Sequence, residues 1–296
     1  MTPKHIILTL LLMLCPIGMA AQSTITRNKP KPAVTKPKPA AKPKAKPAPR
    51  RNSTHHSSST SSTVSLSAEL NKLINNMVYV SGGTFTMGAT SEQGSDVSSD
   101  EKPTHSVTLS SYYICKYEVT QALWQAVMGS NPSFFKGDNL PVEYVSWNDC
   151  QTFINRLNSY TGRNFRLPTE AEWEFAARGG NNSRHYKYSG SNYIGDVAWY
   201  TDNSGCRTHP VGTKQTNELG LYDMSGNVWE WCSDWFGSYS SYSQSNPEGA
   251  NSGSRRVDRG GSWSFDAGCC RSSDRDCDTP GDRVIDLGLR LALSHL

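Results

Sequence analysis

Residues 220–231 read GLYDMSGNVWEW and carry the most informative local pattern of this 296-residue chain. Gly226 and the asparagine after it favour a turn. In a strand that follows the turn, Val228 and Glu230 face one side and the intervening tryptophans face the other. The stretch therefore predicts a turn that leads into a short strand with one aromatic side.

The surrounding sequence has the same irregular character. After Gly179 helical periodicity stops, and the chain becomes rich in Gly, Asn, Ser, Asp and Trp. Eight Trp and thirteen Tyr supply apolar area for burial where long regular elements are missing. These features predict an α+β, loop-rich domain with few helices and short strands.

Three helices are predicted upstream. Thr120 is a plausible N-cap for a helix that ends near Gly129, and a second helix begins at Ser146 and closes at Gly162. In the third, which starts after Pro168, Thr169 and Glu172 have the spacing of a capping box. Strands are predicted at 77–80, 84–88 and 112–119, the first two around a glycine turn.

The N-terminal region predicts export. Residues 1–21 have a basic start, a short apolar run and a small-residue cleavage site, which is typical of a signal peptide. Cys15 suggests a lipoprotein as the alternative, but the large Leu14 before it favours a soluble secreted or cell-envelope product. Residues 22–66 predict an extended Lys/Pro/Ala and then Ser/Thr spacer, and residues 67–296 one folded domain.

Charge is divided between these parts. The spacer has ten basic residues and no acidic one, whereas the chain beyond Leu66 has 19 basic and 26 acidic residues, a net charge of −7. The spacer lacks aromatic residues for base stacking, and an acidic domain does not favour nucleic acid. We expect a tether in the cell envelope, no nucleic-acid partner and no transmembrane helix.

Seven cysteines follow the signal region, so at least one is free or pairs with another chain. Export permits disulfides, but the pairs cannot be deduced. The cysteines are Cys115, Cys150, Cys206, Cys232, Cys269, Cys270 and Cys277.

Seven segments, in one order over about 215 residues, form a larger pattern. They are VSGGTFTMG at 80–88, YEVT at 117–120, PVEYVSW at 141–147, FRLPTEAEWE at 165–174, GLYDMSGNVWEW at 220–231, RGGSW at 259–263 and LGLR at 287–290. Together they resemble the formylglycine-generating enzyme, or sulfatase-modifying factor, family. The resemblance implies a calcium-bearing variant of the C-type lectin fold.

The same resemblance implies an oxidase that converts a sulfatase cysteine to formylglycine with oxygen and copper held by two thiolates. The enzymes carry these thiolates in Gly-Gly-Ser-x-x-Cys-x-x-x-x-Cys. Here Phe265 fills the first cysteine position and Cys270 the second. Because Phe cannot bind copper, we expect no copper site, and the chain is more consistent with a non-catalytic member, with Cys270 packing or forming a disulfide.

The calcium-binding loop of the family matches this sequence more completely than the copper site does. The family pattern Asn/Asp-x-x-Gly-x-x-x-Glu, with two backbone carbonyl ligands, places Asp223, Gly226, Val228 and Glu230 at the ligand positions. Two carboxylates and two carbonyl oxygens suit a hard cation. The alternative is a Gly-Asn turn with Glu230 in a salt bridge.

The segment 256–293 departs from the family scaffold at positions where related secreted domains have Asn. The residues found there are reachable from one Asn codon by changing adenines only, which is the pattern expected of a diversity-generating retroelement; drift is the alternative. With Trp263, they form the expected ligand-binding face: Ser264, Phe265, Asp266, Cys269, Asp274, Asp276, Asp278, Val284, Ile285 and Asp286.

Three functions remain open at this point. The favoured one is an exported ligand-binding or display module for a protein or glycan. The first alternative is the copper- and oxygen-dependent oxidase, and the second a structural component of the cell envelope. The ligand and the oligomeric state cannot be deduced.

Overall fold

The computed structural model describes residues 65–95 and 97–294. The expected signal peptide and all but the last two residues of the expected spacer lie outside these residues. Within the described part, no helix combines the length and apolar character needed to cross a bilayer.

The described part is α+β, with short elements. Its α-helices are α2 (Leu66–Asn75), α3 (Gln121–Met128), α4 (Trp147–Thr161), α5 (Glu170–Ala177) and α6 (Ile194–Val197). Four single 3-10 turns accompany them: η2 (Ser91–Gln93), η3 (Ser99–Glu101), η4 (Gly180–Asn182) and η5 (Ala267–Cys270).

The strands form three small sheets. The first has the order β1 (Met77–Val80), β4 (Tyr112–Cys115), β11 (Ala292–Ser294) and β5 (Phe165–Arg166). The second has the order β10 (Leu287–Leu289), β6 (Trp229–Trp235), β8 (Arg256–Arg259) and β9 (Arg275–Asp278). The third contains β2 (Gly83–Met87), β3 (His105–Leu109) and β7 (Gln244–Ser245).

Three predicted helices are confirmed at their caps. The hydroxyl oxygens of Thr120, Ser146 and Thr169 each accept a hydrogen bond from the third residue after them. The expected capping box at Thr169 is present, and α4 has one as well. These side chains satisfy amides that the first helical turn leaves without partners.

The predicted strands exist but pair differently from a local hairpin. β1 pairs with β4, whereas β2 pairs with β3 in another sheet. The third predicted strand is shorter than expected and ends at Cys115. At the crossover, a Cβ on Gly82 would lie 2.5 Å from the carbonyl oxygen of Leu109, so the backbones approach too closely for a side chain.

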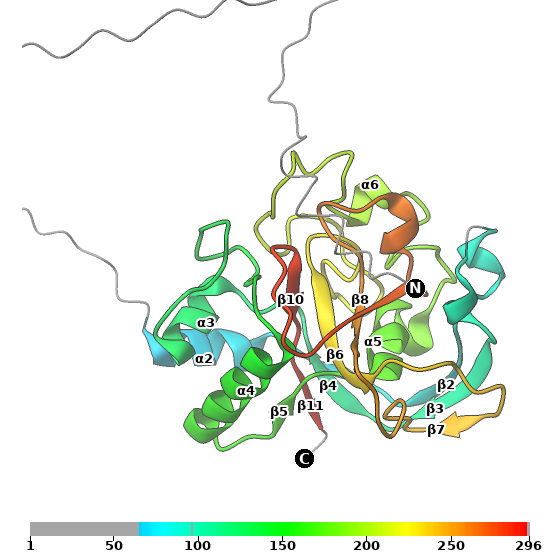
Figure 1. Cartoon of the computed structure of the whole chain (residues 1–296), viewed down its shortest axis with the longest axis horizontal. Helices are drawn as coiled ribbons and strands as arrows, with labels where there is room; N and C mark the ends of the chain where they lie inside the picture. Colours follow the sequence, from blue (N-terminus) through cyan, green and yellow to red (C-terminus); the bar gives the residue numbers. More distant parts are fainter. Residues whose placement is uncertain (1–64, 96, 295–296) are drawn as a thin grey trace, which may run out of the picture. The chain divides into compact units, whose positions relative to one another are not determined.

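Two large apolar clusters hold the sheets and helices together. One lies under α2, α3 and α4, where Trp124 stacks on Phe153 with ring centroids 4.8 Å apart. The other surrounds α5, which packs against β2, β3, β6 and β8. In Figure 1, α2, α3 and α4 lie side by side, and the loop after β8 rises to the same end of the domain as α6.

Candidate functional site

Buried ion pairs anchor the segment that carries the expected ligand-binding residues. Arg271 donates two hydrogen bonds to Glu101, of 2.6 and 2.7 Å, and Arg275 donates two to Glu170, of 2.7 and 2.6 Å. Arg259 contacts Glu174 through a third ion pair. Planar guanidinium groups bind carboxylates through two parallel bonds, which fixes orientation as well as position.

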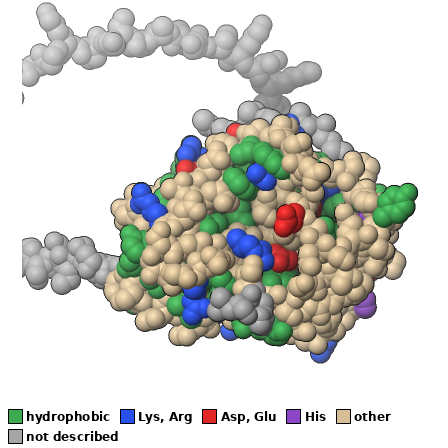
Figure 2. Space-filling model, turned by 90° about the horizontal axis from the view of Figure 1, so that it is seen from below, with side chains coloured by type: hydrophobic (Ala, Val, Ile, Leu, Met, Phe, Trp, Pro, Cys, Tyr) green, Lys and Arg blue, Asp and Glu red, His purple; other side chains and the backbone are tan. Residues whose placement is uncertain are grey.

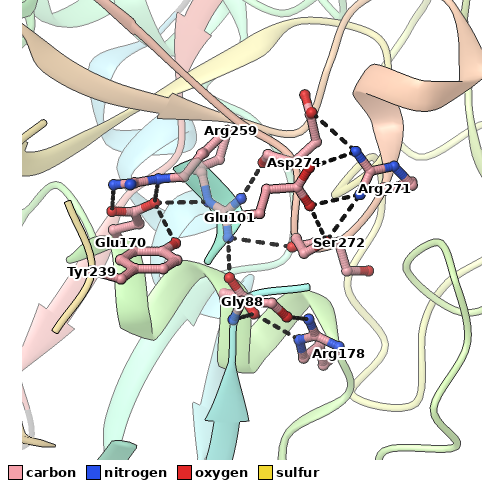
Figure 3. A network of polar contacts seen from close by, with 12 residues as sticks. Gly88, Glu101, Glu170, Arg178, Tyr239, Arg259, Arg271, Ser272 and Asp274 are labelled. Atoms are coloured by element: carbon pink, nitrogen blue, oxygen red, sulfur yellow. Dashed lines mark hydrogen bonds and ion pairs between the residues drawn. The ribbon is translucent and has the colours of Figure 1, made fainter. Parts of the chain in front are cut away.

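Figure 3 shows how these groups form one network. Arg259 also donates to the carbonyl oxygen of Asp274, and Arg271 lies 3.3 Å from an Asp274 carboxylate oxygen. The network ties the chain on both sides of η5 to the turn at η3 and to α5. The loop between its anchors is therefore held at both ends by buried contacts.

The structure divides the eleven expected ligand-binding residues into two groups. Five are buried: Trp263, Asp274, Asp276, Asp278 and Asp286. Buried side chains offer little surface to a ligand, so these five are left out of the candidate face. The six that reach the surface in whole or in part are Ser264, Phe265, Asp266, Cys269, Val284 and Ile285.

Physical reasons for the burial are visible at two of the aspartates. Asp274 belongs to the ion-pair network. Asp286 accepts hydrogen bonds from the hydroxyl groups of Ser262 and Ser264, at 2.6 and 2.9 Å. Both side chains therefore support the loop from inside.

Aromatic side chains surround the accessible residues. The ring of Phe265 lies edge-on to Trp229, with centroids 5.7 Å apart. The ring of Phe135 lies edge-on to Trp263 at 5.5 Å and belongs to the apolar cluster that includes Val284 and Ile285. The structure thus brings Val284 and Ile285 together with the tryptophan of the loop.

Sequence reasoning missed two neighbours of this cluster. Phe134 is 61% exposed and packs edge-on to Phe135, and Tyr144 is 43% exposed. The Tyr144 amide donates to the Val284 carbonyl oxygen at 3.0 Å. Two adjacent phenylalanines in a polar loop were the available signal for the first. We call Ser264, Phe265, Asp266, Cys269, Val284 and Ile285, together with Phe134, Phe135 and Tyr144, the 264–285 face.

A buried carboxyl group supports the Phe134–Phe135 loop. Glu143 accepts a hydrogen bond from the Phe135 amide at 2.9 Å, and its other carboxylate oxygen is buried without a partner. Burial raises the pKa of Glu143 to about 8, and nearby Asp286 acts in the same direction. The Glu143 carboxyl group is therefore mostly neutral at pH 7, and the Phe134–Phe135 loop is hydrogen-bonded to a protonated acid.

Cys270 does not lie in a cysteine pair of the enzyme type. It packs in a cluster with Tyr188 and Val197, whereas Cys269 packs against the large core that includes Trp229. A Cβ on Gly261 would lie 2.7 Å from the Cys270 sulfur, so this glycine permits the close packing. Burial raises the pKa of the Cys270 thiol well above its ordinary value, which disfavours the thiolate that metals bind.

The expected calcium loop is formed but partly committed to other contacts. Asp223 accepts from the Gly212 amide at 2.7 Å, and its second carboxylate oxygen is buried without a partner. Glu230 is bound by Arg290 at 2.7 Å and by the Trp173 indole at 2.6 Å. Gly226 has φ of +80°, and a Cβ there would lie 2.3 Å from the Trp199 carbonyl oxygen.

This donor set fits calcium at Asp223 and less well at Glu230. A cation would satisfy the orphaned Asp223 oxygen, but it would compete with Arg290 for Glu230. Among the described residues, no group of three His, Cys, Asp or Glu side chains gathers as a metal site. The two backbone carbonyl oxygens expected as ligands would have to complete the coordination.

The fold and the motif order agree with comparisons to known proteins. The family of the sulfatase-modifying factor enzyme 1-like domain matches residues 63–295, and the chain belongs to this family. The Treponema denticola variable protein 1 has a similar structure, with a TM-score of 0.68 and 36% identity over 74% of this chain and 95% of that one. The formylglycine-generating-enzyme-like variant of the C-type lectin fold is thereby confirmed.

Two curated relatives have different names. A chaperone protein LppX of Paenibacillus barcinonensis is 37% identical over 64% of this chain and 79% of its own length. The mouse formylglycine-generating enzyme is 36% identical over 60% of this chain, and the match spans 50% of that enzyme. The family thus contains proteins named as enzymes and proteins named otherwise.

Proposed function

We propose that the chain is an exported, non-catalytic binding module whose 264–285 face holds a protein or glycan ligand. The observation that carries this proposal is Phe265, which fills the first copper-ligand position with an aromatic ring packed against Trp229. The same substitution that removes a thiolate adds an aromatic ring to the core cluster against which Val284 also packs. Aromatic side chains supply large contact areas at interfaces.

The ion-pair network supports this proposal by its position. Arg259, Arg271 and Arg275 hold the chain at both ends of the loop, and residues 264–266 lie between the first two without contributing to their ion pairs. Binding sites commonly consist of loops held by a rigid scaffold. Residues on the loop could change without disturbing the buried pairs.

The proposal includes diversification of the accessible positions only. Sequencing the gene from many isolates should show adenine-directed changes at the codons for residues 264–266, 269, 284 and 285. The codons for Arg259, Arg271 and Arg275 serve as internal controls and should stay constant. A near-copy of the segment beside a reverse transcriptase should also lie near the gene. Changes spread evenly over buried and exposed codons would refute diversification.

Binding itself can be tested by photocrosslinking in the producing cells. A photoreactive phenylalanine analogue at position 265 should give a defined crosslinked product. The matched control places the analogue at Tyr160, which is 54% exposed on α4. Equal crosslinking patterns at both positions would contradict a specific ligand on the 264–285 face.

Formylglycine-type oxidase activity is the second candidate, because the second cysteine position is kept by Cys270 and relatives include named enzymes. Calcium at Asp223, Gly226, Val228 and Glu230 belongs to the proposal as a structural ion. Secretion or residence in the cell envelope also belongs to it, through the expected signal peptide and spacer.

A further inference from the structure

A separate pocket lies near the C-terminal end of β11, away from the 264–285 face. It has a volume of about 750 Å³, within the range of roughly 300–1,000 Å³ that small-molecule sites occupy. Its walls come from the β3–β4 connection, the start of α5, the loop at 246–251 and Ser294. Figure 2 shows this face hollowed, with basic and acidic side chains gathered near its centre.

Arg256 in this pocket is held in an unusual way. Its guanidinium group lies between two indole rings, 4.0 Å from the centroid of Trp147 and 3.4 Å from that of Trp235. Nη1 donates to the Ser233 carbonyl oxygen at 2.5 Å. Because both faces of the group are covered, its remaining donors can act only at the edge of the plane.

Arg256 forms no ion pair with a carboxylate of the described part; the nearby Asp234, whose charge acts on it, is instead bound by the Glu170 amide and the Ser233 hydroxyl group. The Nε atom of Arg256 is buried without a hydrogen-bond partner. Burial lowers the pKa of Arg256, and the opposing effect of the nearby Asp234 carboxylate offsets this only in part. Leaving a charge partly desolvated and unpaired costs stability, so a site that keeps it favours an anionic ligand.

The other cation in the pocket is already neutralised. Arg166 makes two hydrogen bonds to Glu172, of 2.6 and 2.7 Å, and a third to the Ser294 hydroxyl group at 3.1 Å. One unpaired guanidinium suits one carboxylate better than a phosphate, whose second charge would meet Glu172 and Glu248. Glu248 is exposed on the wall and can accept hydrogen bonds.

The remaining lining is rich in hydroxyl and amide groups. Ser110 and Asn246 hold each other by two hydrogen bonds, at 2.7 and 3.0 Å, which fixes their orientation. Ser111, Thr169, Ser233 and Ser294 lie at four further points of the wall, each with its hydroxyl group held in a hydrogen bond. Fixed polar groups lose little entropy on binding a ligand with many hydroxyl groups.

We propose that this pocket binds an acidic saccharide, with the carboxylate of a uronic acid at Arg256 and sugar hydroxyl groups at Glu248, Asn246 and Ser110. A guanidinium stacked on indole rings forms directional hydrogen bonds to a carboxylate. Strand β8 begins at Arg256 and leads through Gly260 to the loop of the 264–285 face. The two sites thus lie at opposite ends of one strand.

The test is isothermal titration of the full chain with D-galacturonate and D-glucuronate, and with D-glucose as the neutral counterpart. We expect saturable binding of at least one uronate below about 10 mM and at least tenfold weaker binding of glucose. Arg256→Gln should weaken uronate binding at least about tenfold, and Arg256→Lys should restore little of it because Lys lacks the planar fork.

Substitutions at two exposed positions keep the test independent of folding defects. Glu248→Gln should weaken uronate binding without lowering the thermal midpoint, whereas Asp202→Asn, on the loop next to Phe265, should leave it unchanged. Four results would overturn the proposal: no saturable uronate binding, equal binding of glucose, unchanged binding in both Arg256 variants, or tighter binding of acetyl-Ala-Ala through its free carboxylate.

Discussion

Arg271 and Glu101 are 170 positions apart in the chain, and their side chains form two hydrogen bonds in the protein interior. Glu101 is fully buried and also accepts from the Ser273 hydroxyl group at 2.6 Å. The pair joins the turn at η3 to the residue after η5. The position of the 264–285 face therefore depends on contacts far from it in sequence.

Breaking this pair should destabilise the protein strongly. Arg271→Met leaves the Glu101 carboxylate buried without its cation, and we expect a loss of about 3–5 kcal/mol in the free energy of unfolding. Chemical denaturation measures this loss. Arg283→Met is the matched control, because Arg283 pairs with Asp149 at the surface, where such pairs contribute roughly 0–1 kcal/mol. Equal losses in the two variants would contradict the structural role of Arg271.

The same pair gives an acid dependence. Burial raises the pKa of Glu101, but hydrogen bonds from Arg271 and Ser273 outweigh it and bring the pKa below its ordinary value of 4.5. The folded state then holds fewer protons than the unfolded state near that pH. Stability from this group is present above pH 4.5 and is lost as the pH falls through the folded-state pKa.

Glu143 gives the opposite dependence. Its pKa of about 8 means that the folded state retains a proton between pH 4.5 and 8, so its stability contribution declines as the pH rises through that range. Lys136 lowers the pKa and Asp286 raises it. In Glu143→Gln this decline is absent. We compare the free energy of unfolding of the variant with that of the native chain. Between pH 5 and pH 9 this difference should change by at least about 1 kcal/mol in favour of the variant, which corresponds to roughly 2–4 °C in thermal midpoint.

Thermal midpoints of both proteins at pH 5, 7 and 9 measure that difference. The constant cost of burying the Gln amide cancels in the comparison. A difference that does not change with pH would show that Glu143 is ionised in the folded protein throughout.

Calcium should stabilise the chain through Asp223. Adding calcium to protein treated with chelator should raise the thermal midpoint, because a ligand that binds only the folded state shifts the equilibrium toward it. Asp223→Ala should abolish the shift, and the exposed Asp138→Asn should retain it. No shift in the native chain would mean that Arg290 alone satisfies Glu230.

Local chemistry made the helices predictable from sequence. Thr120, Ser146 and Thr169 are caps whose partners lie three residues away, so the sequence contains the whole interaction. Helix α2 was not predicted, although Leu66, Leu70 and Leu73 have helical spacing after Ser65. The preceding run of Ser and Thr obscured that pattern.

Non-local pairing could not be predicted in the same way. β10 pairs in parallel with β6, and β11 joins β4 in a different sheet, although only two residues separate β10 from β11. In β9, all four residues are buried, so alternation does not separate an inner side from an outer one. Asp276 and Asp278 therefore looked like loop residues but lie within a covered strand.

Only part of the candidate face was predictable from sequence, because some of its contacts are also non-local. The departure from the Asn residues typical of related domains identified residues 264–266 as part of the face, whereas the contact of Phe135 with Trp263 joins segments more than 120 residues apart. No periodicity in the sequence indicates such a contact. The buried partners of Arg259 and Arg271 were hidden for the same reason.

The most direct test of a non-catalytic module is an aldehyde assay with Cu(I), oxygen and a Cys-x-Pro-x-Arg peptide, comparing the native chain with its Cys270→Ala variant. Because Phe265 offers no thiolate, the account predicts no formylglycine from the native chain above the level of the variant. Aldehyde formation that requires Cys270 would contradict it.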